Sequence, residues 1–505
     1  MLQLWWNGLH GLLQVRELMF LGLGMFVGLF FGAIPGLGGA TALALLIPLT
    51  YGLDAFTALA LAGGVMGGVP MGGSITAILL NAPGTAPSAA TCLDGHPMAR
   101  QGKAGLAIGA AASANAIGGI IGTISVLAIL PIAKELVLLF GPPELFLLAV
   151  VGLVIVATAS RGRMLRSLIA GGLGLMMSFV GYNDLTAVQR FTLGIPYLWD
   201  GVRVVPALIG LFAVAEMINL SVRGGAICDD PKTVQINSMM NGLLETFRHW
   251  RTVVRGSLIG TVVGAIPGVG GTVASFLSYS MAMQASKDPE SFGKGNIDGV
   301  IAPEAAINAK DCSCLIPTLA FGIPSGAEMA VFLGILILHG LQPGPLMLID
   351  HQVEIYGLIW ALTASCVLAS FVGLLFVRPL AMLTLLDSQI LVPIVTAVAL
   401  VGSYAIDRSI ENVLLTAFFG ILGYAMIRFE YPRLSMVVAL VLGSTAERNF
   451  HQTMMMGDGN PVIFFNRTVC RVLIVLLIVL LVSPWLRGFA GNRRARILAT
   501  QGSSR

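Results

Sequence analysis

Long uncharged stretches of apolar residues alternate with short polar segments along most of the chain. Residues Leu18 to Leu53, Ala55 to Leu93 and Ala104 to Ala133 contain no Asp, Glu, Lys or Arg. A helix that crosses a bilayer needs about 20 predominantly apolar residues, so each stretch can hold one or two passes. The pattern predicts an all-α polytopic membrane protein with about 10–14 transmembrane segments, some of them broken helices or re-entrant hairpins.

Two kinds of helix-breaking motif occur in pairs within these apolar stretches. Gly-Ala-Ile-Pro-Gly-Leu-Gly-Gly at residues 32–39 returns at residues 264–271 with seven of eight positions identical. An apolar helix that runs into a Pro-containing turn ends at residues 79–84 and again at residues 320–325. The copies lie 232 and 241 residues apart. Matched helix breaks in two halves indicate a duplicated transporter architecture, so we expect two structural repeats, inverted relative to each other.

The polar segments divide the chain into five expected regions. They are an interfacial N-terminal helix (1–16), a first transmembrane repeat (17–222), a cytoplasmic linker (223–251), a second transmembrane repeat (252–487) and a basic cytoplasmic tail (488–505). Within them, residues 94–103 are expected to form a polar loop and residues 234–250 an amphipathic helix. Basic residues cluster at 161–166, 223–255 and 487–496, which by the positive-inside rule places these segments and the C-terminus in the cytoplasm.

Composition supports the membrane class and excludes several functions. The chain is 56% hydrophobic and 11% charged, whereas soluble domains carry about 25% charged residues. The net charge of +4 is explained by the topology signal, so no nucleic-acid partner is expected. The six cysteines form no C-x-x-C pair; Cys312 and Cys314 could touch a metal, but no His lies near them in sequence, and we expect no metal and no cofactor beyond a coupling ion. Residues 1–14 show no signal-peptide pattern.

The helix breaks suit the binding of a small organic anion. A broken helix leaves unpaired N–H groups and a positive dipole end at the start of its second part, which favours a carboxylate. Glycine lets a ligand approach the backbone, and side-chain hydroxyls and amides add neutral hydrogen bonds. An alternative is that these turns only kink tightly packed helices. The candidate substrate-binding residues are Pro35, Gly36, Gly38, Gly39, Ser74, Asn81, Pro83, Gly84, Thr85, Pro267, Gly268, Gly270, Gly271, Gly322, Pro324, Ser325 and Gly326.

Few charged residues lie near these turns, and three polar ones are candidates for ion coupling. Glu304 and Asn308 are four residues apart and share one face if helical. Glu328 begins an otherwise apolar segment, where it could carry a coupling proton or act as a first-turn acid. Lys310 and Asp311 are noted without a role. No catalytic residue is expected, because the chain lacks a Walker A sequence, an H-E-x-x-H motif and a G-x-S-x-G elbow.

These motifs together resemble the large membrane subunit of the tripartite tricarboxylate transporters, the TctA family of bacterial inner membranes. Beyond the two Gly-rich copies, the resemblance rests on the sequences at residues 72–84, 274–279, 292–295, 302–305, 322–324 and 339–345. It covers nearly the whole chain. The sequence departs from the family pattern at Ile307, Ser313-Cys314 and Ser325, in the second-half turn. These differences bear on the substrate rather than on the fold, and a monocarboxylate or an aromatic acid stays open.

The resemblance implies a secondary importer of di- or tricarboxylates such as citrate, driven by a Na⁺ or H⁺ gradient. It also implies a bacterial inner-membrane location and two partners, a small membrane subunit and a periplasmic solute-binding protein. Lipid surrounds the subunit. A small-solute channel and a membrane-embedded enzyme are the alternatives from other classes.

Overall fold

The described part of the chain is almost entirely helical. The computed structural model describes residues 2–137, 140–159, 164–183, 188–223, 238–383 and 388–482. Within them, the strands are β1 (Gly181–Tyr182) and β2 (Gln189–Arg190), which form one antiparallel pair. Seven of the described helices are long and apolar enough to cross a membrane, and five further apolar helices are shorter. The all-α polytopic class is confirmed, whereas the number of spans stays a prediction.

The chain divides into two compact units, each containing segments distant in sequence. The first contains Met1–Val137 and Arg203–Phe429, and the second Leu138–Val202 and Glu430–Arg505. Both helix-breaking motif pairs belong to the first unit. Residues 224–237 of the expected linker and all of the expected basic tail lie outside the described residues, so the five regional boundaries stay predictions.

The second unit packs α22 (Arg433–Met456) against α7 (Pro142–Ala159) and α8 (Met164–Ser178). Gly174 permits this contact because a Cβ there would lie 2.2 Å from the Met436 carbonyl oxygen. Arg190 of β2 forms an ion pair of 2.6 Å with Glu447 of α22, which attaches the strand pair to the helix. The unit also contains the 3₁₀ turn η1 (Pro196–Leu198), α23 (Ile463–Asn466) and an apolar helix at Thr468–Val482.

The first half of the first unit is built around α4 (Ala55–Leu80), of which 89% of the most apolar window is buried. Asp54 begins this helix by accepting a hydrogen bond of 3.0 Å from the Thr57 N–H, and Asn81 ends it in the left-handed conformation. The surrounding helices are α1 (Leu2–Leu12), α2 (Val15–Ala33), α3 (Gly38–Thr50), α5 (Ala89–Arg100) and α6 (Ala104–Val137), and a further span consists of α9 (Val204–Leu208), η2 (Ile209–Val214) and α10 (Ala215–Arg223).

The second half of the first unit begins with α11 (Met239–Arg248) and α12 (Trp250–Gly264), followed by a break and α13 (Gly270–Ala285). After the turn η3 (Pro289–Ser291), α14 (Asp298–Ser313) and α15 (Leu315–Phe321) lead to the second Pro-containing turn. The remaining helices are α16 (Ala327–Leu338), α17 (Met347–Asp350), α18 (Gln352–Leu375), α19 (Val377–Met382), α20 (Ser388–Asp407) and α21 (Ile410–Arg428).

The same glycine contacts occur in both halves of this unit. A Cβ on Gly24, Gly28 or Gly32 of α2 would lie 2.1–2.3 Å from a carbonyl oxygen of α4, at Leu61, Val65 and Val69 respectively. Gly256, Gly260 and Gly264 of α12 face the carbonyls of Ala302, Ala306 and Lys310 of α14 in the same way, at 2.2–2.6 Å. The glycines are again 232 residues apart and the carbonyls 241. These contacts favour the predicted repeats, and their inversion stays a prediction.

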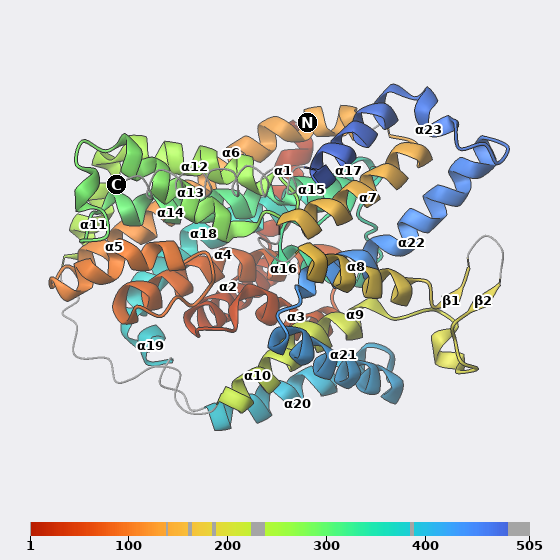
Figure 1. Cartoon of the computed structure of the whole chain (residues 1–505). Helices are drawn as coiled ribbons and strands as arrows, with labels where there is room; N and C mark the ends of the chain where they lie inside the picture. The colour runs from red at the N-terminus through yellow and green to blue at the C-terminus, as the bar shows by residue number, and fades with distance from the viewer. Residues whose placement is uncertain are drawn as a thin grey trace, which may run out of the picture. The chain divides into compact units, whose positions relative to one another are not determined.

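The two halves interlock, as Figure 1 shows for α4 and α18 and for α6 and α14. Gly67 of α4 lies against Ser365 of α18, and Gly118 of α6 lies against the backbone of Ala305 in α14. Small residues at such positions let membrane helices approach closely. Each half therefore provides a long helix that packs on the broken helix system of the other.

One local prediction is wrong. Residues 94–103, expected as a polar loop, include the second half of α5, and Asp94 is fully buried. Its carboxylate accepts hydrogen bonds of 2.8 Å from the N–H groups of Gly295 and Asn296 and from the Tyr279 hydroxyl. The polar residues are thus satisfied by partners from the other half of the chain. The amphipathic helix expected at 234–250 is observed as α11 from residue 239, with residues 234–237 outside the described part.

Candidate functional site

Both Gly-rich copies break their helices in the same backbone conformation. Gly36 and Gly38 have φ values of +91° and +60°, and the matching Gly268 and Gly270 have +74° and +75°. These left-handed conformations are open to glycine at no steric cost, whereas a side chain would strain them. The proline that directly precedes the first of these glycines in each copy has no N–H with which to continue the hydrogen bonding of the preceding helix. The sequence therefore specifies a sharp turn between α2 and α3, and another between α12 and α13.

The two Pro-containing turns also correspond in conformation. Asn81 ends α4 with a φ of +54°, and Gly322, 241 residues later, ends α15 with a φ of +69°. The first turn packs tightly against the end of α2, because a Cβ on Gly84 would lie 1.8 Å from the Gly32 carbonyl oxygen. Thr85 and Ser88 share a hydrogen bond of 2.8 Å between their hydroxyls at this turn.

Each Gly-rich copy contacts the Pro-containing turn of the other half. A Cβ on Gly39, at the start of α3, would lie 2.5 Å from Glu328 Oε1, and the Gly39 N–H donates a hydrogen bond to this carboxylate. A Cβ on Gly271, at the start of α13, would lie 2.8 Å from Pro87. Gly39 and Gly271 are 232 residues apart, and Pro87 and Glu328 are 241 apart. The four helix breaks therefore meet at one place.

A buried lysine lies at this meeting point. Lys310, only 7% exposed, forms an ion pair with Asp311 and interacts electrostatically with Glu328. Its Nζ would be 3.3 Å from a Cβ on Gly271. We call Lys310, Asp311 and Glu328 the Lys310 cluster. Ser325, 1% exposed, lies in the adjoining turn.

A second polar group lies on the same helix, six residues before Lys310. Glu304 is fully buried and is contacted by Ser74 at 2.6 Å and by Thr91 at 2.5 Å. The Asn115 side-chain amide forms a further hydrogen bond with it. We call Glu304, Ser74, Thr91 and Asn115 the Glu304 pocket. Asn308 adjoins it by donating a hydrogen bond to Asn115.

The sequence-predicted site residues fall into three groups. Gly39, Gly271, Ser325, Gly326 and Glu328 lie at or beside the Lys310 cluster, whereas Ser74, Glu304 and Asn308 belong to or adjoin the Glu304 pocket. The others form the turns themselves: Gly36 and Asn81 are exposed, Gly84, Thr85, Gly322 and Pro324 are buried, and Pro35, Gly38, Pro83, Pro267, Gly268 and Gly270 are half-buried. Whether any of them binds substrate stays a prediction.

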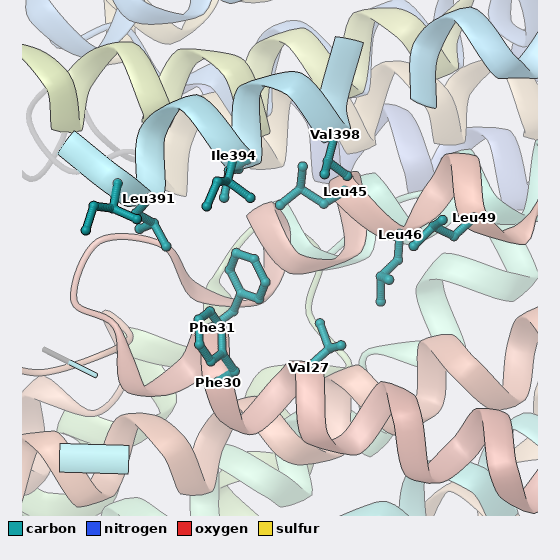
Figure 2. A pocket seen from close by; sticks show the side chains of 11 residues that line it. Val27, Phe30, Phe31, Leu45, Leu46, Leu49, Leu391, Ile394 and Val398 are labelled. Carbon is teal, nitrogen blue, oxygen red and sulfur yellow. The ribbon is translucent and has the colours of Figure 1, made fainter. Parts of the chain in front are cut away.

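A separate cavity of about 390 Å³ lies between α2, α3 and α20. Figure 2 shows that its labelled side chains, from Val27 and Phe30 on α2 to Ile394 on α20, are all hydrocarbon. A carboxylate would lose its hydration there without gaining a partner. This cavity therefore does not suit the expected carboxylate substrate.

Comparison with known proteins decides the family. The family described as "Tripartite tricarboxylate transporter TctA family" matches residues 18–438. The chain belongs to the TctA family. An Agrobacterium vitis protein, "Uncharacterized 52.8 kDa protein in TAR-I ttuC' 3'region", is 33% identical over 90% of each chain. A second from that organism, "Uncharacterized protein in TAR-II ttuC' 3'region", is 30% identical over 46% of this chain and 97% of its own length. No solved structure matches.

Membership of the TctA family makes this chain a component of a tripartite tricarboxylate transporter and confirms the sequence-based resemblance. Sequence reasoning did not give a role to Lys310 or Asp311, and it did not find Thr91, Asn115 or Asp94. Their signal in the sequence is weak, since each is a single polar residue in an apolar context. Only the packing of distant helices shows what each of them contacts.

Proposed function

We propose that this TctA-family chain is the large membrane subunit that moves a small carboxylate across the bacterial inner membrane. A Na⁺ or H⁺ gradient drives uptake, a periplasmic solute-binding protein delivers the substrate, and a small membrane subunit completes the transporter. The C-terminus faces the cytoplasm. The substrate is a tri- or dicarboxylate such as citrate.

The observation that supports this proposal is the Lys310 cluster between the two Gly-rich helix breaks. At the start of α3, the Gly39 N–H already binds a carboxylate, that of Glu328. At the corresponding start of α13, the atoms nearest to a Cβ on Gly271 belong to Pro87 and to the side chain of Lys310, including its ammonium group. A helix N-terminus beside a buried cation is a favourable site for a carboxylate.

The charges of the cluster suggest how the site responds to substrate. In the present arrangement Asp311 pairs with Lys310, and Glu328 lies within electrostatic reach. A substrate carboxylate at α13 would share Lys310 with these two acids. Because like charges repel in a poorly hydrated site, binding would weaken the contacts of Lys310 with Asp311 and Glu328. Glu328 and Lys310 come from different helices, so this change would loosen α16 from α14.

Uptake into proteoliposomes tests the proposal. The vesicles contain this chain with its small partner, a citrate-loaded binding protein is added outside, and Na⁺ or proton gradients are imposed separately. We expect saturable uptake of radiolabelled citrate that requires the binding protein and one of the gradients. Uptake that ignores both gradients and the binding protein would instead indicate a channel.

Lys310→Met should lower the apparent affinity for citrate on the order of 100-fold, because the buried cation is lost. The double variant Lys310→Met/Asp311→Asn keeps the cluster's charge balance and should remain equally defective. Lys287→Met, at an exposed loop lysine, is the control and should transport normally. If Lys310→Met folds and transports like the wild type, the site is elsewhere.

A further inference from the structure

We infer that Glu304 is protonated in this conformation and that the Glu304 pocket is the proton-coupling site of the transporter. This inference rests on the proposed function only for the role in transport. It specifies H⁺ as the coupling ion and assigns the carrier and its hydrogen-bond partners. The protonation state itself can be measured without any substrate.

The location of Glu304 makes an unpaired charge costly. Its side chain is fully buried among helices from both halves of the chain: Ser74 comes from α4, Thr91 from α5 and Asn115 from α6. All three partners are neutral, and no Lys, Arg or His among the described residues forms an ion pair with Glu304. An ionised carboxylate without a cation in such surroundings is strongly disfavoured, so the group takes up a proton instead.

The hydroxyl of Ser74 provides the second argument. Its oxygen lies 2.8 Å from the Pro70 carbonyl oxygen and 2.6 Å from Glu304 Oε2. The hydroxyl has one hydrogen, and the Pro70 carbonyl can only accept. If Ser74 donates to Pro70, it must accept from Glu304, which requires a proton on Oε2. The Thr91 hydroxyl then donates to Oε1 at 2.5 Å, and every group is satisfied.

The same contacts also serve the ionised form, as a proton carrier requires. When the pocket opens to water, the proton passes from Oε2 to a water molecule, giving a carboxylate and a hydronium ion. Ser74 then rotates its O–H from Pro70 to Oε2, while Thr91 and Asn115 continue to donate. The distances from the Glu304 carboxyl oxygens to the hydroxyl oxygens of Thr91 and Ser74, 2.5 and 2.6 Å, are those of direct hydrogen bonds. The Glu304 carboxyl and these two hydroxyls therefore enclose a proton rather than a larger cation.

Many other ionisable groups on the helices around Glu304 have partners of their own or are exposed. The Cys92 thiol of α5 interacts with Glu304 electrostatically. Asp94 and Tyr279 bond to each other, Lys310 and Asp311 pair on α14, and His249 and Asp298 pair at the start of α14. His96 of α5 contacts the Ile78 carbonyl, Cys312 of α14 contacts Thr123, and Cys366 of α18 bonds to Asn308. Arg100 of α5 and Arg251 and Arg255 of α12 are exposed.

The pocket is mechanically connected to the Lys310 cluster. Glu304 and Lys310 are six residues apart on α14, which separates them by about 9 Å along the helix. Asn308 lies between them and bonds both to Asn115 of α6 and to Cys366 of α18. A shift of α14 on substrate binding would therefore change the contacts of Glu304 as well. The same helix, α14, carries both the proposed proton carrier, Glu304, and the lysine proposed to bind the substrate, Lys310. Sharing one helix is the simplest way to couple the two sites.

Infrared difference spectroscopy tests the protonation without substrate. We expect the purified wild-type protein at neutral pH to show the carbonyl stretch of a protonated carboxylic acid that is absent from Glu304→Gln. Ser74→Ala should shift this band, because the acid loses its acceptor. Glu290→Gln, at an exposed loop residue, should leave it unchanged. If the wild-type spectrum contains no carboxylic-acid band that is absent from the Glu304→Gln spectrum, the inference is wrong.

Transport measurements test the coupling. Glu304→Gln mimics the protonated side chain, so it should keep citrate exchange between the two sides of the vesicle and lose accumulation driven by a pH gradient. Accumulation like that of the wild type would overturn the inference, as would wild-type uptake driven by Na⁺ with no response to pH. If the wild type transports no carboxylate at all, the proposed function fails, and the infrared result still decides the protonation of Glu304.

Discussion

At the scale of single residues, Asp94 shows how polar side chains connect the two halves. Its carboxylate receives three hydrogen bonds from the second half, two from backbone N–H groups and one from Tyr279. A charged acceptor that satisfies buried donors is worth more than an ordinary hydrogen bond, because its removal leaves the donors without a partner. Asp94 is therefore a structural residue, although its sequence context indicated a loop.

Asp94→Ala should destabilise the protein by about 3 kcal/mol, since three donors lose their acceptor. Tyr279→Phe removes a single donor and should cost about 1 kcal/mol. Thermal unfolding in detergent checks the order of the two variants against Asp288→Ala, at an exposed residue. Equal midpoints for Asp94→Ala and Tyr279→Phe would show that the backbone contacts contribute little.

The candidate site illustrates what single residues reveal before the fold is known. Glycines and prolines predict helix breaks, because their effects on backbone conformation are local. Glu304 and Glu328 stand out in the sequence as acids in apolar segments. Lys310 was equally visible, but its meaning depends on Gly271 and Glu328, which come from other helices. Ser74 was expected at the anion site, and the structure places it against Glu304 instead, 230 residues away in sequence.

At the scale of elements, the start of α14 is attached to the start of α12 by a histidine and an acid. His249 and Asp298 form a hydrogen bond of 2.8 Å. This bond is the main cause that raises the pKa of His249 above its usual 6.5. Burial acts to raise the pKa of Asp298, but the hydrogen bonds from His249 and Thr252 outweigh it and leave the pKa below the usual 3.8. Glu245 also faces His249, at 3.6 Å.

This contact should make stability depend on pH. The raised pKa of His249 gives a stabilisation that is complete below about pH 6.5 and is lost as the pH rises through the folded-state value; the lowered pKa of Asp298 preserves it down to about pH 3.8. The difference in unfolding midpoint between wild type and His249→Ala should thus be largest near about pH 6 and shrink towards about pH 9. His10→Ala, at an exposed histidine, should show no such trend; a constant His249→Ala difference would refute the assignment.

The observed helix boundaries agree closely with the predicted ones where a proline, a glycine or a capping residue sets them. α2 ends at Ala33, two residues before Pro35, and α4 runs from the Asp54 cap to Asn81. The prediction is wrong at α5, because its polar residues are buried against the other half of the chain rather than exposed to solvent. The division of the first and second units also has no local signal, because it depends on which distant helices pack together rather than on any linker composition.

At the scale of the whole molecule, the separations of 232 and 241 residues between the repeated motifs also relate the helix-packing contacts of the two halves. Gly28 faces the Val65 carbonyl and Gly260 faces the Ala306 carbonyl at almost equal Cβ distances of 2.3 and 2.2 Å. Neither neighbour can move easily, since both are backbone atoms in buried helices. The two interfaces are thus equivalent in geometry although their sequences differ.

Gly28→Ala and Gly260→Ala should therefore destabilise the protein by similar amounts, about 1–3 kcal/mol each, through overpacking. Gly22→Ala provides the matched control on α2, because a Cβ there meets nothing within 4 Å, and alanine should be neutral or stabilising. Thermal unfolding of the three variants measures this. A large cost at one glycine and none at its counterpart would argue against equivalent interfaces.

The contacts of Gly39 with Glu328 and of Gly271 with Pro87 have a consequence for directionality. Two halves with matching backbones, exchanging roles during transport, would on their own make the two end states equally stable. An acid at one position and a proline at its counterpart removes that equality. One end state closes with a carboxylate bound to a helix N-terminus, and the other closes on a hydrocarbon ring. The resting transporter should therefore favour one side of the membrane, so that the apparent substrate affinities on the two sides differ, while the two one-way fluxes stay equal when no gradient is present.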